Sequence, residues 1–315
     1  MFEFCITRPM GWIIEQIYRL VSNYGLSIII FTILFKLVLL PLNIKSQKAM
    51  RKTQKIQPLL ADLQKKYAND KERLQMETMK LYKENNVSMT GGCLPMLIQL
   101  PILFGLYRVI YAPIKYLLGV ADADGISRVG ELKEAIIAAG ENIGNLASTA
   151  NDIIWKNSQI QVSQWAQTLN EGDPWTINFN FLGLDLSNVP SKAFGYLTSG
   201  NMEWSIILLL LIPIIAVAAA VVTNKITMAQ SGQNNSNNET AAQMSKSMNL
   251  MMPLMTGFFT LTLPAGLGIY WIISSIMQIV QQLVLNYYLD KKGDDFVAKV
   301  PERKQIHGKN SKKRR

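Results

Sequence analysis

Five stretches of this sequence are long, apolar and almost free of charge, and strongly charged segments separate them. A helix needs about 20 apolar residues to cross the hydrocarbon core of a bilayer. Charged residues make up 17% of the chain, below the roughly 25% that is usual in soluble domains. The pattern therefore predicts an all-α integral membrane protein with five transmembrane helices. The predicted spans are residues 24–42, 91–118, 204–222, 248–263 and 264–289.

The segments between the spans differ in charge, and this difference predicts the orientation. Residues 43–90 and the tail, 290–315, carry 21 of the 32 Lys and Arg, whereas 119–203 carries ten acids and four basic residues. Cytoplasmic loops collect Lys and Arg. We therefore expect a multi-pass protein of the cell membrane with its N-terminus outside, 119–203 as an acidic insert outside, and a cytoplasmic C-terminal tail. Cys5 and Cys93 then lie at opposite faces and are not expected to pair.

The remaining segments also have predicted structures. Residues 43–90 have helical periodicity broken at Pro58, and Tyr67–Asp70 fits a turn, which predicts a basic cytoplasmic helical hairpin. Residues 1–23 contain an amphipathic pattern that fits an interfacial helix outside, with an extension of the first span as the alternative. Residues 223–247 form a polar cytoplasmic linker, expected to be flexible because its centre is nearly all Gln, Asn, Ser and Gly.

Lys36 is the one charged residue inside the predicted first span. A lysine at mid-span costs about 2.5–3.5 kcal/mol on insertion scales, and such residues usually have a function. The alternative is that its long side chain extends toward the membrane surface; we favour a role in a wet cavity. Thr32, four residues earlier, lies on the same helical face. No acid lies in any span core, so Lys36 would attract an anionic segment by about 1.7 kcal/mol at about 10 Å and an effective dielectric near 20.

A stripe of polar side chains follows one face of the last predicted span. Three glutamines there are unlikely to face lipid, because each amide must find hydrogen-bond partners. Ordinary bonding between helices is the alternative explanation for any one of them. Taken with Gln99 in the second span and with Lys36, the stripe predicts a hydrated groove. Its members are Trp271, Ser274, Ser275, Gln278, Gln281 and Gln282.

Catalytic functions find little support in the sequence. The single histidine, His307, lies in the tail, and two cysteines cannot build a metal cluster. There is no P-loop and no H-E-x-x-H motif. We therefore predict that the chain is not an enzyme and has no metal, cofactor or catalytic residue.

Several stretches in a fixed order resemble the YidC family of membrane protein insertases, of the bacterial five-span type. The first is the opening span with its single buried cation, followed by a basic hairpin. The others lie in and around the later spans. The stretches are Gly25–Leu42, Gln57-Pro58, Gly91–Pro101, Phe181–Leu186, Met252-Pro253, Pro264–Leu267 and Tyr270-Trp271.

The resemblance implies a function in protein transport. Members of the family form five helices around a hydrophilic groove that opens to the cytoplasm and lipid. They act as insertases and chaperones that translocate short polar or acidic segments of nascent membrane proteins and release the apolar segments into lipid. The groove cation, usually Arg, corresponds to Lys36, which lacks the planar fork of Arg. The residues expected in the substrate groove are Lys36, Thr32, Gln99, Trp271, Ser274, Ser275, Gln278 and Gln282.

Partners and alternative functions follow from the same features. Nascent membrane proteins are the expected substrates. The basic hairpin and tail are candidate contacts for the ribosome, the Sec translocon and anionic lipid, although positive-inside bias alone would explain the tail; no DNA partner is predicted. A chaperone that depends on the translocon and has no insertase activity of its own is one alternative. A small-solute transporter is another, but the repeated span pairs of transporters are not evident.

Overall fold

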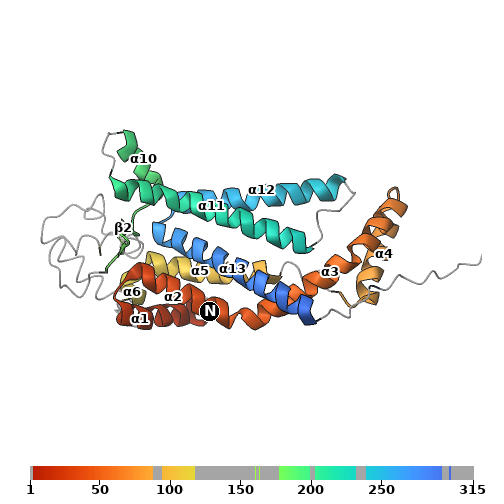
Figure 1. Cartoon of the computed structure of the whole chain (residues 1–315), viewed down its shortest axis with the longest axis horizontal. Coiled ribbons are helices and arrows are strands. Elements are labelled where there is room, and N and C mark those ends of the chain that lie inside the picture. The colour runs from red at the N-terminus through yellow and green to blue at the C-terminus, as the bar shows by residue number, and fades with distance from the viewer. Residues whose placement is uncertain are drawn as a thin grey trace, which may run out of the picture.

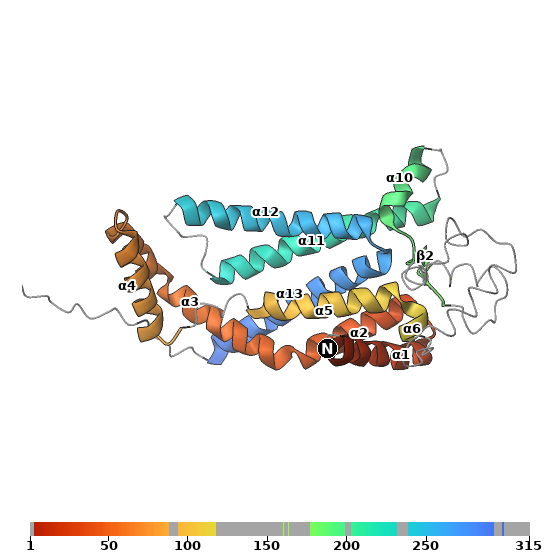
Figure 2. The ribbon, with the colours of Figure 1, turned by 180° about the vertical axis from the view of Figure 1, so that it is seen from behind.

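Long helices run side by side along the longest axis of the molecule (Figure 1), and the view from behind agrees (Figure 2). The structure is a computed structural model that describes residues 3–87, 94–117, 160, 163, 177–198, 203–231, 239–292 and 298. Helix α13 is central: it packs against α11 and α2, and α11 packs in turn against α12. The helices are η1 (Glu3–Thr7, a π-helix), α1 (Arg8–Val21), α2 (Tyr24–Val38), α3 (Leu40–Lys66), α4 (Lys71–Glu84), α5 (Leu94–Tyr111), α6 (Pro113–Leu117), α10 (Pro190–Thr198), α11 (Trp204–Ser231), α12 (Glu239–Thr262) and α13 (Ala265–Lys292).

The described helices include membrane-crossing lengths of apolar sequence. Trp204–Met228 in α11 and Ala265–Lys291 in α13 are each long and apolar enough to cross a bilayer. Helices α2 and α3 meet the same test together, as a pair bent by 57°. Leu250–Thr262 in α12 is a shorter apolar helix. The fold is therefore that of an all-α membrane protein, and the count of five spans remains a prediction.

Helix α1 lies beside α2 and carries its apolar residues on two sides. Met10, Ile14 and Ile17 are buried, and α1 packs on α2, α5 and α6. Trp12 and Leu20 remain exposed, although both are large and apolar. A helix with one buried stripe and further exposed apolar side chains suits the membrane interface, where we predict residues 1–23 to lie.

The chain bends between α2 and α3 because of a proline. Pro41 lies in the first turn of α3, where its missing N–H is tolerated, but its ring clashes with the carbonyl of Leu37 if the preceding helix continues. The chain therefore breaks at Leu39, and α3 leaves at 57° to α2. The predicted boundary between the first span and the basic hairpin falls inside α3.

The basic hairpin consists of α3 and α4, joined at the predicted turn. Asp70 caps α4 by accepting a hydrogen bond from the N–H of Arg73 at 3.1 Å. The prediction that Pro58 breaks the hairpin helix is wrong, because α3 runs through it without interruption. Pro58 and Gln54 are both exposed, so water can bond the Gln54 carbonyl that loses its helical partner.

Residues 223–247 were predicted to be a flexible linker, but helices occupy most of this segment. Helix α11 continues to Ser231 and α12 already begins at Glu239; residues 232–238 lie outside the described residues. The hydroxyls of Thr223 and Thr227 donate to carbonyls four residues earlier, at 2.8 and 2.9 Å, so polar side chains are satisfied within the helix. No Gly or Pro interrupts this stretch before Gly232.

A small hairpin from the predicted acidic insert covers one end of the helices. Strands β1 (Asn180–Phe181) and β2 (Leu184–Asp185) pair in antiparallel register. Leu182 and Gly183 between them both have positive φ, as a two-residue hairpin turn with matching twist requires. Most of 119–203 otherwise lies outside the described residues.

The residues on either side of this hairpin supply the acceptors that helix N-termini need. The N–H of Tyr24, at the start of α2, donates to the Asn178 carbonyl at 3.0 Å. At the start of α13, Ala265 and Gly266 donate to the carbonyls of Asn188 and Leu186, at 2.9 and 3.0 Å. The first N–H groups of a helix have no partner within it. The hairpin segment thus ties α2 and α13 together at this end.

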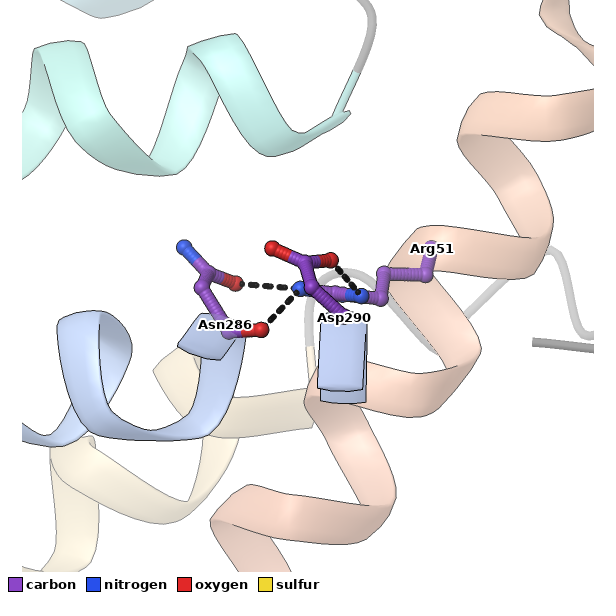
Figure 3. A network of polar contacts seen from close by, with 3 residues as sticks. All are labelled: Arg51, Asn286 and Asp290. Carbon is purple, nitrogen blue, oxygen red and sulfur yellow. Dashed lines mark hydrogen bonds and ion pairs between the residues drawn. The ribbon is translucent and has the colours of Figure 1, made fainter. Parts of the chain in front are cut away.

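A side-chain network ties α3 to the opposite end of α13. Arg51 of α3 donates to the carboxylate of Asp290 at 2.7 Å, and to the side-chain and backbone oxygens of Asn286 at 3.0 and 3.1 Å (Figure 3). Both partners lie in the last turns of α13. The guanidinium therefore fixes the base of the basic hairpin to the end of the central helix.

Candidate polar site around Lys36

Lys36 lies in the last turn of α2, and its side chain is largely buried, with 8% of its surface exposed. Thr32, one turn earlier on the same face, is 1% exposed. The Thr32 hydroxyl donates to the Ile28 carbonyl at 2.6 Å, so it is already satisfied within its own helix. In the described part of the chain the Lys36 ammonium makes no hydrogen bond or ion pair.

Gln281 of α13 bridges the bend that follows Lys36. Its amide nitrogen donates to the backbone carbonyl of Lys36 at 3.0 Å, and its amide oxygen accepts from the Asn43 side chain at 3.1 Å. One buried amide therefore holds the end of α2 and the start of α3 against the same turn of α13. This contact fixes the position of the Lys36 backbone relative to the central helix.

A second polar link joins α5 to α13. The amide nitrogen of Gln99 donates to the Tyr270 hydroxyl in a short hydrogen bond. The Tyr270 hydroxyl is also bonded to Ser274, one turn further along α13. Tyr270 and Ser274 are buried, so this chain of three polar groups lies between helices.

The remaining residues of the predicted stripe point toward other helices. Trp271 stacks on Phe259 of α12, with ring centroids 6.1 Å apart. Gln282 donates to the Thr227 hydroxyl of α11 at 2.9 Å. Ser275 and Gln278 are half-buried.

The predicted stripe therefore divides into two faces, because successive residues turn by about 100° around a helix. One face carries Tyr270, Ser274 and Gln281, and it meets α5 and the α2–α3 bend. The other carries Trp271 and Gln282, and it meets α12 and α11. The structure thus brings Lys36, Thr32 and Gln281 together, links Gln99 to Ser274, and directs Trp271 and Gln282 elsewhere.

Two residues of this site were absent from the set of groove candidates. Gln281 belonged to the polar stripe but not to the set, and Tyr270 was noted only within a motif. Tyr270, Ser274 and Gln281 are spaced four and seven residues apart, which is the signal of a shared face. Tyr270 escapes detection because an aromatic residue in an apolar span resembles core packing.

The charge of Lys36 has little local compensation. The helices α2, α5 and α11 contain no acidic residue, and the acids of α12 and α13 lie only at the outermost ends of those helices, at Glu239 and Asp290. Interactions between charges are strong in a medium of low dielectric constant. A buried, uncompensated cation next to satisfied polar side chains favours an anionic group that arrives from outside the protein.

The fold and this site define a class of protein: a multi-pass, all-α membrane protein with a basic helical hairpin and, among the residues that the structure describes, one buried cation. Residues 16–292 match the model of the family described as 60Kd inner membrane protein. The chain belongs to this family.

Several curated relatives are named membrane protein insertase YidC. The relative from Caldanaerobacter subterraneus subsp. tengcongensis is 31% identical over 279 residues, which are 89% of this chain and 93% of that protein. The relative from Leptospira interrogans is 31% identical over 301 residues, which are 94% of this chain and 36% of that protein. A relative from Nitratidesulfovibrio vulgaris is 48% identical over 105 residues, or 33% of this chain. The chain thus spans nearly all of one relative and just over a third of another.

Proposed function

We propose that this chain is a membrane protein insertase and chaperone for nascent membrane proteins. Its family and the names of its relatives support this activity. The observation that carries the proposal is Lys36, a buried cation with no acidic residue on its own helix or on α5. The proposed activity makes and breaks no covalent bond, so it requires no catalytic residue in this chain.

The proposed groove lies where α2, α5 and α13 meet, around Lys36. A short acidic segment of the substrate enters and is attracted by the ammonium, by about 1.7 kcal/mol at 10 Å if the effective dielectric is about 20. Gln99 and Ser274 belong to the proposed polar wall, with Thr32 beside the cation. The proposal also includes Ser275 and Gln278, which are half-buried. Trp271 and Gln282 contact α12 and α11, so they would join the groove only if it extends around α13 toward those helices. The wall reduces the cost of removing the polar segment from water.

The apolar part of the substrate then moves into lipid. Large apolar side chains of α12, among them Leu254 and Phe258, are exposed on the protein surface, as lipid-facing residues are. Transfer of about 20 apolar residues into the hydrocarbon core supplies the driving force. No nucleotide hydrolysis by this chain is needed.

The proposed orientation places the groove opening at the cytoplasmic side. Five spans with the N-terminus outside put the basic hairpin and tail in the cytoplasm, as the distribution of Lys and Arg favours. The small hairpin at the start of α2 and α13 then lies outside, where its hydrogen bonds hold these two helices together. The basic hairpin and tail are proposed to contact the ribosome, the Sec translocon or anionic lipid.

Insertion into liposomes tests the proposal. The substrate is a single-span protein with an acidic N-terminal tail, and empty vesicles are compared with vesicles that contain the chain. We expect insertion to require the chain and to fall at least about tenfold in Lys36→Ala. The lost attraction of about 1.7 kcal/mol exceeds the roughly 1.4 kcal/mol that corresponds to a factor of ten. Lys36→Arg should retain insertion because it keeps the charge.

A matched control removes an equal charge from the hairpin. Lys65→Ala, at an exposed position in α3, should insert the substrate as the unchanged chain does. If Lys36→Ala inserts the substrate normally, the proposed insertase activity stands but the proposed electrostatic role of Lys36 is wrong. Insertion no higher than in empty vesicles would instead favour the chaperone that needs the translocon.

A further inference from the structure

A basic pocket of about 200 Å³ lies between the first turns of α3 and the chain that follows α4. Lys45, Lys48 and Lys52 line it, together with Ala49. The lysines are spaced three and four residues apart, so all three lie on one face of α3. Ala49 lies between them and is small, which leaves space in front of the ammonium groups.

The end of α4 forms the other wall of the pocket. The N–H of Asn86 donates to the Lys83 carbonyl at 3.1 Å, and the N–H of Val87 donates to the Tyr82 carbonyl at 3.0 Å. This pair of bonds, with Asn86 in the left-handed conformation at φ 50°, is the Schellman motif of a helix C-terminus. The motif turns the chain so that Asn86 and Val87 line the pocket against α3.

The charge of the lining suits an anion. Three of the six lining residues are lysines and none is acidic. The like charges of Lys45 and Lys48, three residues apart on the helix, repel one another, and a bound anion removes this repulsion. Each ammonium has three donors and the Asn86 amide has two more, a set that suits the several acceptor oxygens of a phosphate group.

The position of the pocket favours a phosphate that belongs to a lipid. Lys45 is nine residues beyond Lys36, or about 14 Å of helix at 1.5 Å per residue, and it follows the bend between α2 and α3. Leu34, Leu37 and Val38 of α2 are exposed apolar side chains about two to three turns before Lys45. A lipid whose acyl chains contact α2 would thus carry its headgroup to the level of the pocket.

We propose that this pocket binds the phosphate headgroup of one anionic phospholipid. The bound headgroup would join the base of α3 to the end of α4 and fix the basic hairpin at the membrane surface. This site is separate from Lys36, and its occupancy does not depend on the insertase activity.

Native mass spectrometry of the full chain in mild detergent tests the proposal, with phosphatidylglycerol as the probe and phosphatidylcholine as the uncharged comparison. We expect one bound phosphatidylglycerol per chain. The variant K45Q/K48Q/K52Q should lose at least about tenfold in affinity, since a lysine near an anionic surface contributes about fivefold. K45R/K48R/K52R should bind as the unchanged chain does.

A matched control removes three charges at the hairpin tip. K65Q/K66Q/K71Q changes exposed lysines. Lys65 and Lys66 lie about 30 Å along α3 from Lys45, beyond the Debye length of about 8–10 Å, and Lys71 begins α4 after the turn. This variant should keep its bound lipid. Equal loss in both triple variants would overturn the proposal, because attraction to the overall positive charge would then explain the binding.

A second variant tests the Asn86 wall without altering any charge. Asn86→Gly keeps the left-handed conformation that the Schellman motif requires but removes the amide, and it should weaken lipid binding about threefold, as loss of one hydrogen bond worth about 0.5–1.5 kcal/mol implies. Circular dichroism should show unchanged helix content.

Competition experiments distinguish the sources of phosphate. Millimolar inorganic phosphate or a short poly(U) RNA should not displace the lipid. Displacement by inorganic phosphate at similar affinity would overturn the lipid assignment in favour of a free-phosphate site. Binding of poly(U) that is lost only in K45Q/K48Q/K52Q would overturn it in favour of RNA.

Discussion

Adjacent residues of α13 make contacts with different helices. Gln281 bonds the Lys36 carbonyl and Asn43, whereas Gln282 bonds Thr227 of α11. A step of about 100° per residue around the helix separates the two amides. Gln282 also has a buried amide oxygen without a hydrogen-bond partner among the described residues. Gln281 therefore joins α13 to the bend between α2 and α3, and Gln282 joins it to α11. Buried polar groups need such partners where lipid excludes water.

Gly268 allows α13 to approach α11 closely. A methyl group at this position would overlap the side chain of Ile212, which is buried. We expect Gly268→Ala to lower the free energy of unfolding by about 1–3 kcal/mol, as overpacking does. Unfolding of the purified protein in detergent, followed by circular dichroism, measures this change.

Gly195→Ala is the control for that substitution. Gly195 also lies in a helix, α10, but it is exposed and a methyl group there would meet nothing within 4 Å. This variant should be unchanged or gain up to about 1 kcal/mol from the lower flexibility of the unfolded chain. A similar gain in Gly268→Ala would show that α13 and α11 have room to separate.

At the scale of elements, the two ends of α13 are held by different means. At its start, backbone N–H groups bond the carbonyls of the small hairpin segment. At its end, the Arg51 guanidinium of α3 bonds Asn286 and Asp290 (Figure 3). The first arrangement uses no charge and cannot be screened by salt, whereas the second includes an ion pair with an exposed carboxylate.

The Arg51 network should control the mobility of the basic hairpin. Arg51→Met keeps most of the side-chain volume and removes every hydrogen bond to α13. We expect faster hydrogen exchange of the backbone in α3 and α4, with a loss of about 1–3 kcal/mol in the local opening free energy, because the oxygens of half-buried Asn286 lose their donor.

Two comparisons separate the contributions of the network. Arg51→Lys should restore little, because an ammonium cannot bond three oxygens in the planar geometry of the guanidinium. Asp290→Asn should change exchange by less than Arg51→Met, since ion pairs with exposed groups contribute about 0–1 kcal/mol. Unchanged exchange in Arg51→Met would mean that packing alone positions the hairpin.

At the scale of the whole molecule, the two ends of the long helices differ in charge and in hydrogen bonding. The basic hairpin of α3 and α4 lies at one end of the long helices, and the small β1–β2 hairpin lies at the other (Figures 1 and 2). The Arg51 network joins the basic hairpin to the end of α13. This asymmetry matches the division of Lys and Arg along the sequence. It supports the proposed orientation, with the basic end in the cytoplasm.

Cysteine labelling tests this orientation. Cys5 is exposed in the structure and is proposed to lie outside. In a Cys93→Ser variant, a maleimide reagent that does not cross membranes should label Cys5 in intact cells. A cysteine introduced as Lys65→Cys, in a chain without Cys5 and Cys93, should react only after the membrane is opened. The reverse pattern would contradict the proposed orientation.

The sequence alone determined the class of protein, because composition and length govern membrane insertion directly. Apolar runs, a single lysine within one of them and an uneven distribution of charge can all be recognised without any contact being known. The sequence was less informative about where helices begin and end. Pro58 and the polar residues after Val222 suggested interruptions, but both helices continue. Water can bond the carbonyl that Pro58 leaves without a partner, and the hydroxyls of Thr223 and Thr227 bond carbonyls of their own helix.

Only the tertiary structure decided which polar residues meet. The stripe of Ser, Gln and Trp on α13 is wide enough to face more than one neighbouring helix. Its spacing in the sequence therefore cannot assign each side chain to a partner. The packing of α13 between α2 and α11 made that assignment: Gln281 reached the carbonyl of Lys36, and Gln282 reached Thr227. The physical reason is that a sequence sets the direction of a side chain around its own helix, whereas its partner depends on where the other helices lie.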